Sequence, residues 1–493
     1  MKVRPNTNVP AARVRVLNDA PVREDGDYVL YWMTAFRRRG YNFALQLAAE
    51  RSAELGKAIV VLEGLRCDYP WASDRLHAFV LQGMEENRRA FGRAGIKYVP
   101  FVELSPREGR GLLEILSERA CCVVADDSPV FFLPRMLYSA SQRLNVRVEG
   151  VDSNGLLPLR EVPGAFPTAH AFRRFLQKTL KPHLLAFPAA DPLLGRPVLP
   201  FAKIPKEVSE RWPEPARNML SGTATALASL PIDHAVAPVA LLGGEKAARQ
   251  VLRTFIGERL SRYDEDRNRT DVEGTSGLSP YLHFGHVSAH EVFEAVAQKE
   301  SWSIEHVPQR ATGSRTGWWG MGPQAEGFLD QLVTWRELGF NAALHLPGYE
   351  SFETLPGWAV RTLLKHARDP RPKVYSLEEF EGARTHDPLW NAAQRQLRRE
   401  GRLHNYLRML WGKKILEWCP SPPEALEVMI HLNNKYALDG RDPNSTSGIC
   451  WCLGRYDRPW GPERPVFGTV RYMSSENTAR KVRVADYIAR YTP

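Results

Sequence analysis

Four short apolar runs, separated by helical patterns, constrain the fold of this chain most strongly. The runs are YVLYWM from Tyr28, AIVVLEGL from Ala58, IKYVPFVEL from Ile96 and CCVVADD from Cys121. Between them, apolar residues recur at helical spacing over 41–56, 76–94 and 111–119. Continuously apolar strands that alternate with helices are typical of a parallel sheet covered on both faces. The pattern predicts a doubly wound α/β domain over 27–152, preceded by a flexible lead-in over 1–26.

The remainder of the chain divides into a connector and a helical part. Residues 153–243 are rich in Pro, Leu and Ala and show little periodicity, apart from a helix expected at about 170–180. So long a segment without regular structure is unusual inside one domain, so we interpret it as an interdomain linker. From residue 244 the helical pattern continues to residue 493. The expected fold class is an N-terminal α/β domain followed by an all-α domain, which suits a chain of 493 residues.

Composition excludes several classes of protein. No apolar run is long enough to span a bilayer, and the N-terminal segment MKVRPNTNVP lacks the apolar core of a secretory signal. We therefore expect a cytoplasmic protein, associated with the nucleoid if the chain is prokaryotic. The six cysteines fit neither a disulfide framework nor paired zinc-ligand spacing, and no metal site is expected. The formal net charge of +10 and the 13 tryptophans favour a polyanionic partner with unstacked bases.

The stretch from Leu403 to Met473 concentrates residues that carry chemistry. Its first part predicts a helix in which Trp411 and Trp418 share one face, ended by Pro420. By itself such an apolar stripe indicates an ordinary core. Carboxylates, guanidiniums and tryptophans alternate after it more densely than a packed core requires. A basic run of Arg455, Arg458, Arg464 and Arg471 follows, which is a set of phosphate contacts or a solvated face.

Two upstream segments carry alternatives as well. The segment TSGLSPYLHFG from Thr275 places Gly and hydroxyl residues before a helix, which suits phosphate binding or a plain capped turn. In GFLDQLVTWRELGF, Phe328, Leu332, Trp335 and Leu338 form one helical stripe. Taken alone, that stripe indicates a half-buried helix with a surface ion pair.

The motifs LDGRDPN, ERPVFG and RYM, the helix containing HNYLRM, and THDPLWNAAQ together resemble one family. They are similar to the class II cyclobutane pyrimidine dimer photolyases of the photolyase and cryptochrome family, over nearly the whole chain. The resemblance implies a carbon–carbon lyase that repairs ultraviolet-damaged DNA with light and reduced FAD in its helical domain. It also implies an antenna pigment, such as a deazaflavin, in the α/β domain. We expect a monomer.

The resemblance carries roles over to individual residues. The flavin contacts that it implies are Tyr263, Thr275, Ser276, Gly277, Leu278, Ser279, Arg336, Asn405, Arg408, Asp439 and Arg441. The catalytic group comprises the electron-transfer residues Trp390, Trp411 and Trp418, Asn433 facing the flavin, and Gln331 at the lesion. The implied contacts with damaged DNA are Trp335, Met409, Trp451, Arg458 and Arg464.

One position departs from the family pattern. Class II members usually carry two glutamates where this chain has Asp330 and Gln331. Glutamine donates and accepts hydrogen bonds but cannot release a proton. This leaves open a preference for the (6-4) photoproduct, or a cryptochrome-like photoreceptor that signals through a partner. A DNA-binding protein without cofactor is a third alternative. The short segment after RYM and the presence of Trp335, Met409 and Trp451 favour repair.

Overall fold

The computed structural model describes residues 8–196, 199 and 203–492. These residues form two compact units whose segments interleave along the chain. Unit 1 comprises the described residues of Met1–Pro163, Thr179–Arg253 and Leu278–Ile304. Unit 2 comprises Gly164–Lys178, Thr254–Gly277 and the described residues of Glu305–Pro493. The sequence predicted consecutive domains with boundaries at 152 and 243, and these boundaries stay predictions. Residues 1–7, 197–198 and 200–202 of the predicted lead-in and linker lie outside the described part.

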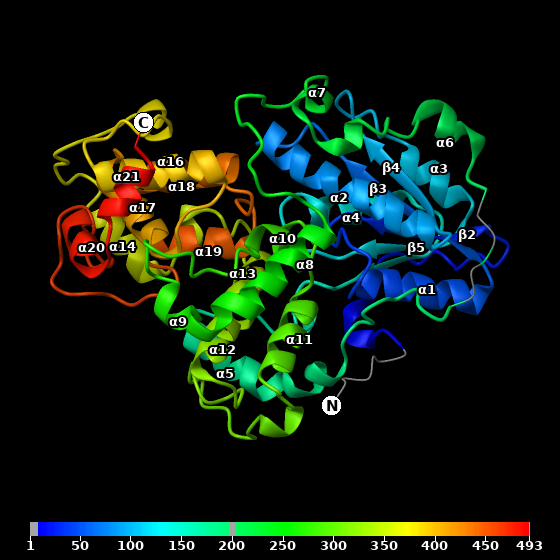
Figure 1. Cartoon of the computed structure of the whole chain (residues 1–493), viewed down its shortest axis with the longest axis horizontal. Helices are drawn as coiled ribbons and strands as arrows, with labels where there is room; N and C mark the ends of the chain where they lie inside the picture. Colours follow the sequence, from blue (N-terminus) through cyan, green and yellow to red (C-terminus); the bar gives the residue numbers. More distant parts are fainter. Residues whose placement is uncertain (1–7, 197–198, 200–202, 493) are drawn as a thin grey trace. The chain divides into compact units, whose positions relative to one another are not determined.

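Unit 1 is built on a six-stranded sheet in the order β1-β6-β5-β2-β3-β4 (Figure 1). The strands are β1 Val14–Val16, β2 Tyr28–Met33, β3 Ala58–Leu65, β4 Lys97–Val102, β5 Ala120–Asp126 and β6 Val148–Val151. All neighbours pair in parallel except β1, which pairs antiparallel with β6 in the register Val14 to Val151. The predicted parallel sheet is confirmed. The edge strand β1 lies in the segment that sequence analysis treated as a lead-in, because three residues are too few to show a period.

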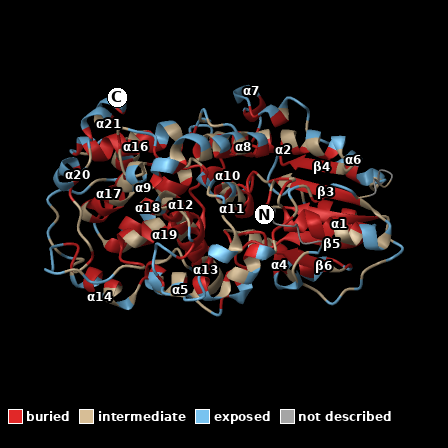
Figure 2. Cartoon of the chain, turned by 60° about the horizontal axis from the view of Figure 1, so that its bottom comes forward, coloured by how far each residue is buried: buried red, intermediate tan, exposed pale blue. Residues whose placement is uncertain are grey.

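Side chains of β2 alternate between two apolar layers. Tyr28, Leu30 and Trp32 face a core completed by α3 and α4, whereas Val29, Tyr31 and Met33 face a core completed by α1. Both β2 and β5 are buried along their whole length, and Figure 2 shows the buried colour at β5. The helices of this unit are α1 Phe43–Leu55, α2 Asp74–Arg93, α3 Leu112–Glu118, α4 Leu133–Arg143, α6 Lys206–Arg211, α7 Ala224–Leu227, α8 Glu245–Thr254, α10 Ser279–His283 and α11 Ala289–Lys299.

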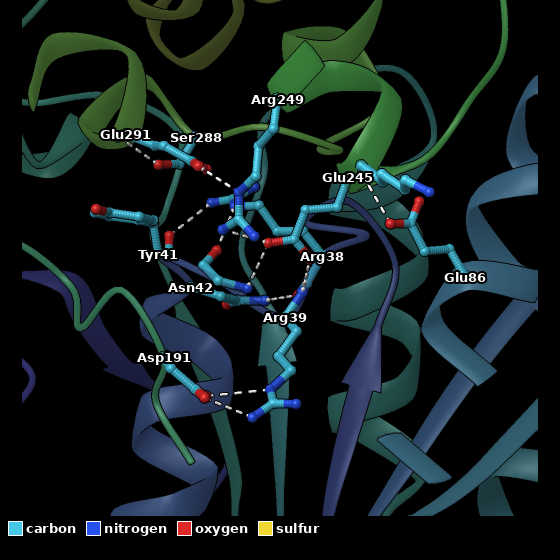
Figure 3. Close-up of polar contacts among 12 residues, drawn as sticks. Arg38, Arg39, Tyr41, Asn42, Glu86, Asp191, Glu245, Arg249, Ser288 and Glu291 are labelled. Atoms are coloured by element: carbon cyan, nitrogen blue, oxygen red, sulfur yellow. Dashed lines mark hydrogen bonds and ion pairs between the residues drawn. The ribbon is translucent and has the colours of Figure 1, made fainter. Parts of the chain in front are cut away.

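A buried polar cluster fastens residues 278–304 to the sheet of unit 1 (Figure 3). Arg38, 1% exposed, donates to the backbone oxygens of Gly40, Gly285 and Tyr41. Beside it, Arg249 forms ion pairs with both Glu245 and Glu291. Gly285, at φ +73°, lies so close to the oxygen of Ala35 that a Cβ would be 2.0 Å away. These contacts join segments that are far apart in sequence, so composition could not place them in this unit.

Helices account for the regular secondary structure of the described residues of unit 2, apart from one isolated bridge between Arg464 and Gly468, as predicted for the C-terminal part. Its helices are α5 Ala169–Thr179, α9 Tyr263–Asp266, α12 Pro323–Leu329, α13 Arg336–His345, α14 Gly357–Lys365, α15 Leu377–Glu381, α16 Pro388–Glu400, α17 Asn405–Trp418, α18 Pro422–Tyr436, α19 Pro443–Cys452, α20 Ser475–Lys481 and α21 Ala485–Arg490. Two π-helical turns interrupt helices that the sequence predicted as continuous, at Phe255–Arg259 and Asp330–Trp335. Such turns often occur at functional sites. None of the described helices is long and apolar enough to cross a membrane.

Candidate functional site

The three predicted electron-transfer residues lie in the core of unit 2. Trp411 and Trp418 lie on α17 and are each 2% exposed, while Trp390 on α16 is fully buried. The indole nitrogen of Trp390 donates to the backbone oxygen of Trp411 at 3.1 Å. The ring centroids of Trp390 and Trp418 are 5.9 Å apart. Trp411 is fixed in turn by a 2.9 Å hydrogen bond from its indole nitrogen to Gln394 Oε1.

The aromatic contacts continue beyond Trp418 to residues that sequence analysis did not single out. The Trp418 ring packs against Tyr375 at 5.5 Å and against His386 at 5.1 Å between centroids. The hydroxyl of Tyr375 lies 2.6 Å from Nδ1 of His386, which is exposed. Ring contacts therefore run from the buried Trp390 through Trp418 to Tyr375 and the exposed His386. Neither Tyr375 nor His386 lies on a periodic stripe; His386 belongs to the motif THDPLWNAAQ, but nothing in the sequence placed either ring against Trp418.

A second group of predicted residues surrounds the turn between α18 and α19. Arg408 donates to Ser445 Oγ at 2.8 Å, and Asn433 donates to the same oxygen at 3.1 Å. Asn433 also donates to the backbone oxygen of Gly440 at 2.7 Å. A Cβ at Gly440 would lie 2.5 Å from the Asn433 oxygen, which explains the glycine in LDGRDPN. Arg408, Asn433 and this turn thus form one compact arrangement.

Asp439 is the unusual member of this arrangement. Its side chain is 11% exposed, and its carboxylate lies 3.9 Å from Arg408 Nη2. The Asp439 carboxylate accepts no hydrogen bond from any described residue, although buried carboxylates are normally hydrogen-bonded. Arg441, on the same turn, is also buried. The Asp439 carboxylate can therefore still accept hydrogen bonds, next to the Arg408 guanidinium and the turn held by the Asn433 amide.

The remaining predicted cofactor residues lie on other segments. Tyr263 is buried against Phe255 and Phe328, and burial raises the pKa of its hydroxyl. Asn405 is exposed at the start of α17, where its side chain donates to Asn268 Oδ1 at 3.1 Å. Arg336 is buried, with its guanidinium 4.5 Å from the Phe340 ring.

The TSGLSP segment spans the division between the two units. Thr275, Ser276 and Gly277 belong to unit 2, while Leu278 and Ser279 belong to unit 1. Thr275 accepts a hydrogen bond from Arg259 through its backbone oxygen, and its hydroxyl donates to Glu273. Gly277 has φ +71°, a conformation that a side chain would strain. The helix α10 that follows has five residues and begins at Ser279.

The predicted lesion contacts lie on α17, α19 and a π-helical turn. Gln331 and Trp335 belong to the turn Asp330–Trp335, and the side chain of Gln331 makes no hydrogen bond with described residues. Arg173 on α5 holds this turn, because its guanidinium binds the buried Asp330 carboxylate at 2.7 and 3.1 Å. The next helix, α13, packs closely on α19, where a Cβ at Gly339 would lie 2.7 Å from the Asn444 nitrogen.

Cations and aromatic rings alternate around Trp451 at the end of α19. Lys413 and Arg471 each lie 5.3 Å from the Trp451 ring centroid. Arg471 also lies 4.0 Å from the Trp460 ring, and Arg458 lies 4.2 Å from it. Met409 on α17 faces α19: its Cε lies 3.9 Å from the position that a Cβ at Gly448 would take.

The basic residues of this region differ in accessibility. Arg458 and Arg464 are exposed, and Arg464 lies over the Tyr472 ring. Arg471 is paired with Asp457. Arg455 is only 2% exposed and donates to Tyr349 O and Thr354 Oγ1, so it supports the fold instead of facing solvent. The described residues contain no cluster of His, Cys, Asp or Glu that could hold a metal, and all six cysteines are buried free thiols.

Comparisons with known proteins bear on this arrangement. The chain is 33% identical to a deoxyribodipyrimidine photo-lyase of Methanothermobacter thermautotrophicus, with 98% of each chain covered. It is 33% identical to one of Oryza sativa, with 97% and 90% covered, and 30% identical to one of Potorous tridactylus, with 98% and 84% covered. No protein-family model matches the chain.

Solved structures share the fold at lower identity. A bacterial class III photolyase from Agrobacterium tumefaciens superposes with a TM-score of 0.68 and 18% identity, covering 94% of this chain and 86% of that one. A cryptochrome of Synechocystis superposes with a TM-score of 0.65 and 16% identity, covering 94% and 88%. These two show the shared fold, and the full-length sequence relatives show the family. The chain belongs to the deoxyribodipyrimidine photo-lyase family.

Proposed function

We propose that this chain is a light-dependent DNA repair enzyme of class II that splits cyclobutane pyrimidine dimers. The observation that carries the proposal is full-length similarity to relatives named deoxyribodipyrimidine photo-lyase. It is supported by the buried Trp390, Trp411 and Trp418, two of which lie on α17 together with Arg408, the partner of Asp439. Members of the photolyase and cryptochrome family bind FAD, and damaged DNA is the partner that the activity requires.

The residues around Asp439 fit a flavin. A flavin presents ring N–H and hydroxyl donors as well as carbonyl acceptors, and Asp439 offers a carboxylate that no described residue uses. Arg408 supplies a guanidinium beside it, and the Asn433 amide holds the turn by donating to Gly440 O and Ser445 Oγ. Bound reduced FAD would supply, on absorbing light, the electron that opens the cyclobutane ring, and would recover it after cleavage. The guanidinium of Arg408 would favour a negative charge held nearby.

Other residues of this chain have tasks in positioning and electron supply. Trp390, Trp411 and Trp418 would conduct electrons inward, because all three are buried, the Trp390 and Trp418 rings are in contact, and the Trp390 indole is hydrogen-bonded to the Trp411 backbone. Trp335, Trp451 and Met409 would form the apolar walls for an extruded lesion, each base stack being worth about 1–3 kcal/mol. Arg458 and Arg464 are exposed and would bind phosphates. We propose a monomer, and a deazaflavin antenna in unit 1.

The specific alternative is a photoreceptor, favoured by the likeness to the Synechocystis cryptochrome fold and by Gln331. The deciding experiment incubates purified, chemically reduced protein with irradiated DNA and measures cyclobutane dimers and (6-4) products in blue light and in darkness. Light-dependent loss of cyclobutane dimers alone is the expected result. Loss of (6-4) products would change the lesion assignment, and loss of neither by a photoreducible yellow protein would overturn the repair proposal.

Gln331→Glu is the matched variant for the lesion contact. It restores the residue that class II relatives usually carry and keeps the side-chain length. If Gln331 only hydrogen-bonds the lesion, the variant should repair the same product as the natural chain. A change of product between the two proteins would show that this position selects the lesion.

A further inference from the structure

Lys413 is a buried cation for which the proposed mechanism has no use. It lies in the middle of α17, and its side chain is fully buried. Its Nζ donates to the backbone oxygen of Cys452 at 2.6 Å and forms no ion pair with a described carboxylate. Burying an ammonium without a carboxylate is costly, and an apolar side chain of similar size normally stabilises such a site better. The aromatic face of Trp451, 5.3 Å away, offers this charge a further stabilising contact.

Trp451 connects Lys413 to the exposed surface through alternating cations and rings. The order is Lys413, Trp451, Arg471, Trp460 and Arg458, with each cation 4.0 to 5.3 Å from a ring centroid. Asp457 anchors the outer part, accepting hydrogen bonds from Arg471 and from the indole nitrogen of Trp460. Of the three cations, only Lys413 is an amine that deprotonates near neutral pH. We name these five residues the cation–aromatic ladder.

Among Lys413 and the titratable groups that face it, only the Lys413 ammonium has a pKa near 8. Burial, and to a smaller extent the charge of Arg471, lower the pKa of the Lys413 ammonium to about 8, although Cys452 and Asp457 oppose the shift. Burial raises the pKa of the Cys452 thiol to about 11, so this neighbour stays neutral. Burial opposes ionisation of Asp457, but hydrogen bonds from Arg471, the Arg458 N–H and Trp460 hold the pKa of its carboxyl below the usual value.

We propose that Lys413 is a positioning residue for Trp451: its ammonium holds the indole ring in one orientation, ready to stack on a pyrimidine extruded from damaged DNA. The proposal rests on the proposed repair function, in which Trp451 is a wall of the lesion site. When the amine is neutral, the ring loses this electrostatic attraction and turns more freely. Binding of damaged DNA should then weaken as the pH rises past 8, whereas binding of undamaged DNA should not follow the same curve.

The first test observes Trp451 itself, without DNA. Holoprotein labelled with 5-fluorotryptophan gives fluorine resonances by NMR, and the Trp451 resonance is the one missing from Trp451→Phe. In the natural protein this resonance should shift with a midpoint near pH 8. In Lys413→Arg and in Lys413→Met the shift should vanish. A Trp451 resonance that does not titrate in the natural protein, or that titrates equally in Lys413→Met, would overturn the proposal.

The second test measures affinity for damaged duplex at about pH 7 and pH 9.5, with undamaged duplex as reference. Loss of one cation–π contact should weaken lesion binding about two- to thirtyfold at the higher pH. Lys413→Arg should bind well at both values, and Lys413→Met weakly at both. Lys435→Met is the matched control, because Lys435 also lies over a ring, that of Tyr436, but does not contact Trp451.

A double-mutant cycle separates positioning from general damage to the fold. In a Trp451→Leu background, Lys413→Met should cause no further loss of lesion affinity. Full additivity of the two changes would overturn the proposal. A natural protein that binds damaged and undamaged duplex equally would contradict the repair function instead, and the fluorine resonance of Trp451 would still decide whether Lys413 controls the ring.

Discussion

The two units bury charged groups in different ways. In unit 1, the Asp126 carboxylate at the end of β5 accepts hydrogen bonds from the N–H groups of Thr34, Ala35 and Phe36 and from the Tyr31 hydroxyl, each at 2.8 Å. In unit 2, the Asp439 carboxylate accepts none from described residues, and the Lys413 ammonium has a single hydrogen-bond acceptor. Hydrogen-bonding capacity that the fold does not use suits a ligand. Unit 2 also holds structural buried charges, such as Asp330 bound by Arg173. We therefore expect Asp126 to stabilise unit 1, whereas Asp439 and Lys413 are the buried charges of unit 2 that a ligand or a functional role would explain.

The position of Asp126 adds to this contrast. In a sheet ordered β5-β2-β3, the crevice at the carboxyl ends of β5 and β2 is the usual place for a ligand. Here the loop after β2 folds over Asp126 and occupies its acceptor atoms. An antenna pigment in unit 1 would therefore have to use other groups.

The largest effect is expected from Trp411→Phe in unit 2. Phenylalanine fills most of the space but is far harder to oxidise than tryptophan, so light-driven reduction of oxidised FAD should fall to a small fraction of that in the natural protein. Repair by chemically reduced protein should be spared, while the free energy of unfolding should fall by about 2–4 kcal/mol, because a cavity remains and Gln394 Oε1 loses its donor. Photoreduction followed by absorbance measures the effect. Equal rates in the two proteins would contradict a relay through Trp411.

Asp126→Ala tests the structural half of the comparison. The change leaves three buried N–H groups and a hydroxyl without their acceptor, so the free energy of unfolding should drop by about 3–5 kcal/mol. Denaturant titration measures this drop, and Asp126→Asn, which keeps one carbonyl acceptor, should lose less. A stable Asp126→Ala protein would break the distinction between the units.

Asp439→Ala tests the functional half. Little stability should be lost, because no described residue donates to this carboxylate. The affinity for FAD should fall about 10- to 100-fold, as expected for loss of a charged hydrogen bond. Flavin content after purification and dialysis reports the change, with Asp439→Asn as the conservative control. Full flavin occupancy in Asp439→Ala would rule out its assignment as a cofactor contact.

Lys413→Met should stabilise the protein by about 1–3 kcal/mol at pH 7 while weakening lesion binding. The pKa of Lys413 is about 8 in the folded protein, against about 10.4 in an unfolded chain. Well below pH 8 the folded protein buries the Lys413 ammonium, and the full desolvation penalty lowers the free energy of unfolding. Between the two pKa values Lys413 is neutral in the folded protein and charged in the unfolded chain, so its destabilising effect decreases as the pH rises. Melting curves at both ends of this range check the sign, and a variant that is less stable at pH 7 would contradict it.

The smallest effect is expected at the exposed arginines. Arg458→Ala and Arg464→Ala should each reduce the slope of log affinity for DNA against log salt by about one. The effect on damaged and undamaged duplex should be equal, because phosphates carry no lesion information. Salt titrations measure the slopes. An unchanged slope in both variants would remove these residues from the interface and leave the basic run as a solvated face.

Much of the molecule follows from the sequence by itself. Apolar runs such as YVLYWM are local, so they predict β2 and its neighbours directly, and the helical stripe of Trp411 and Trp418 likewise predicts α17. Family motifs pointed to the Arg408 and Asn433 region, although their flavin roles stay predictions. Tertiary structure alone decided what depends on distant segments. β1 exists because β6 pairs with it, and the ring contacts of Tyr375 and His386 require α17 beside them. Lys413 resembles any surface lysine in a helical pattern, and only the packing of α19 against α17 buries it under Trp451, because burial is a property of neighbours and not of sequence period.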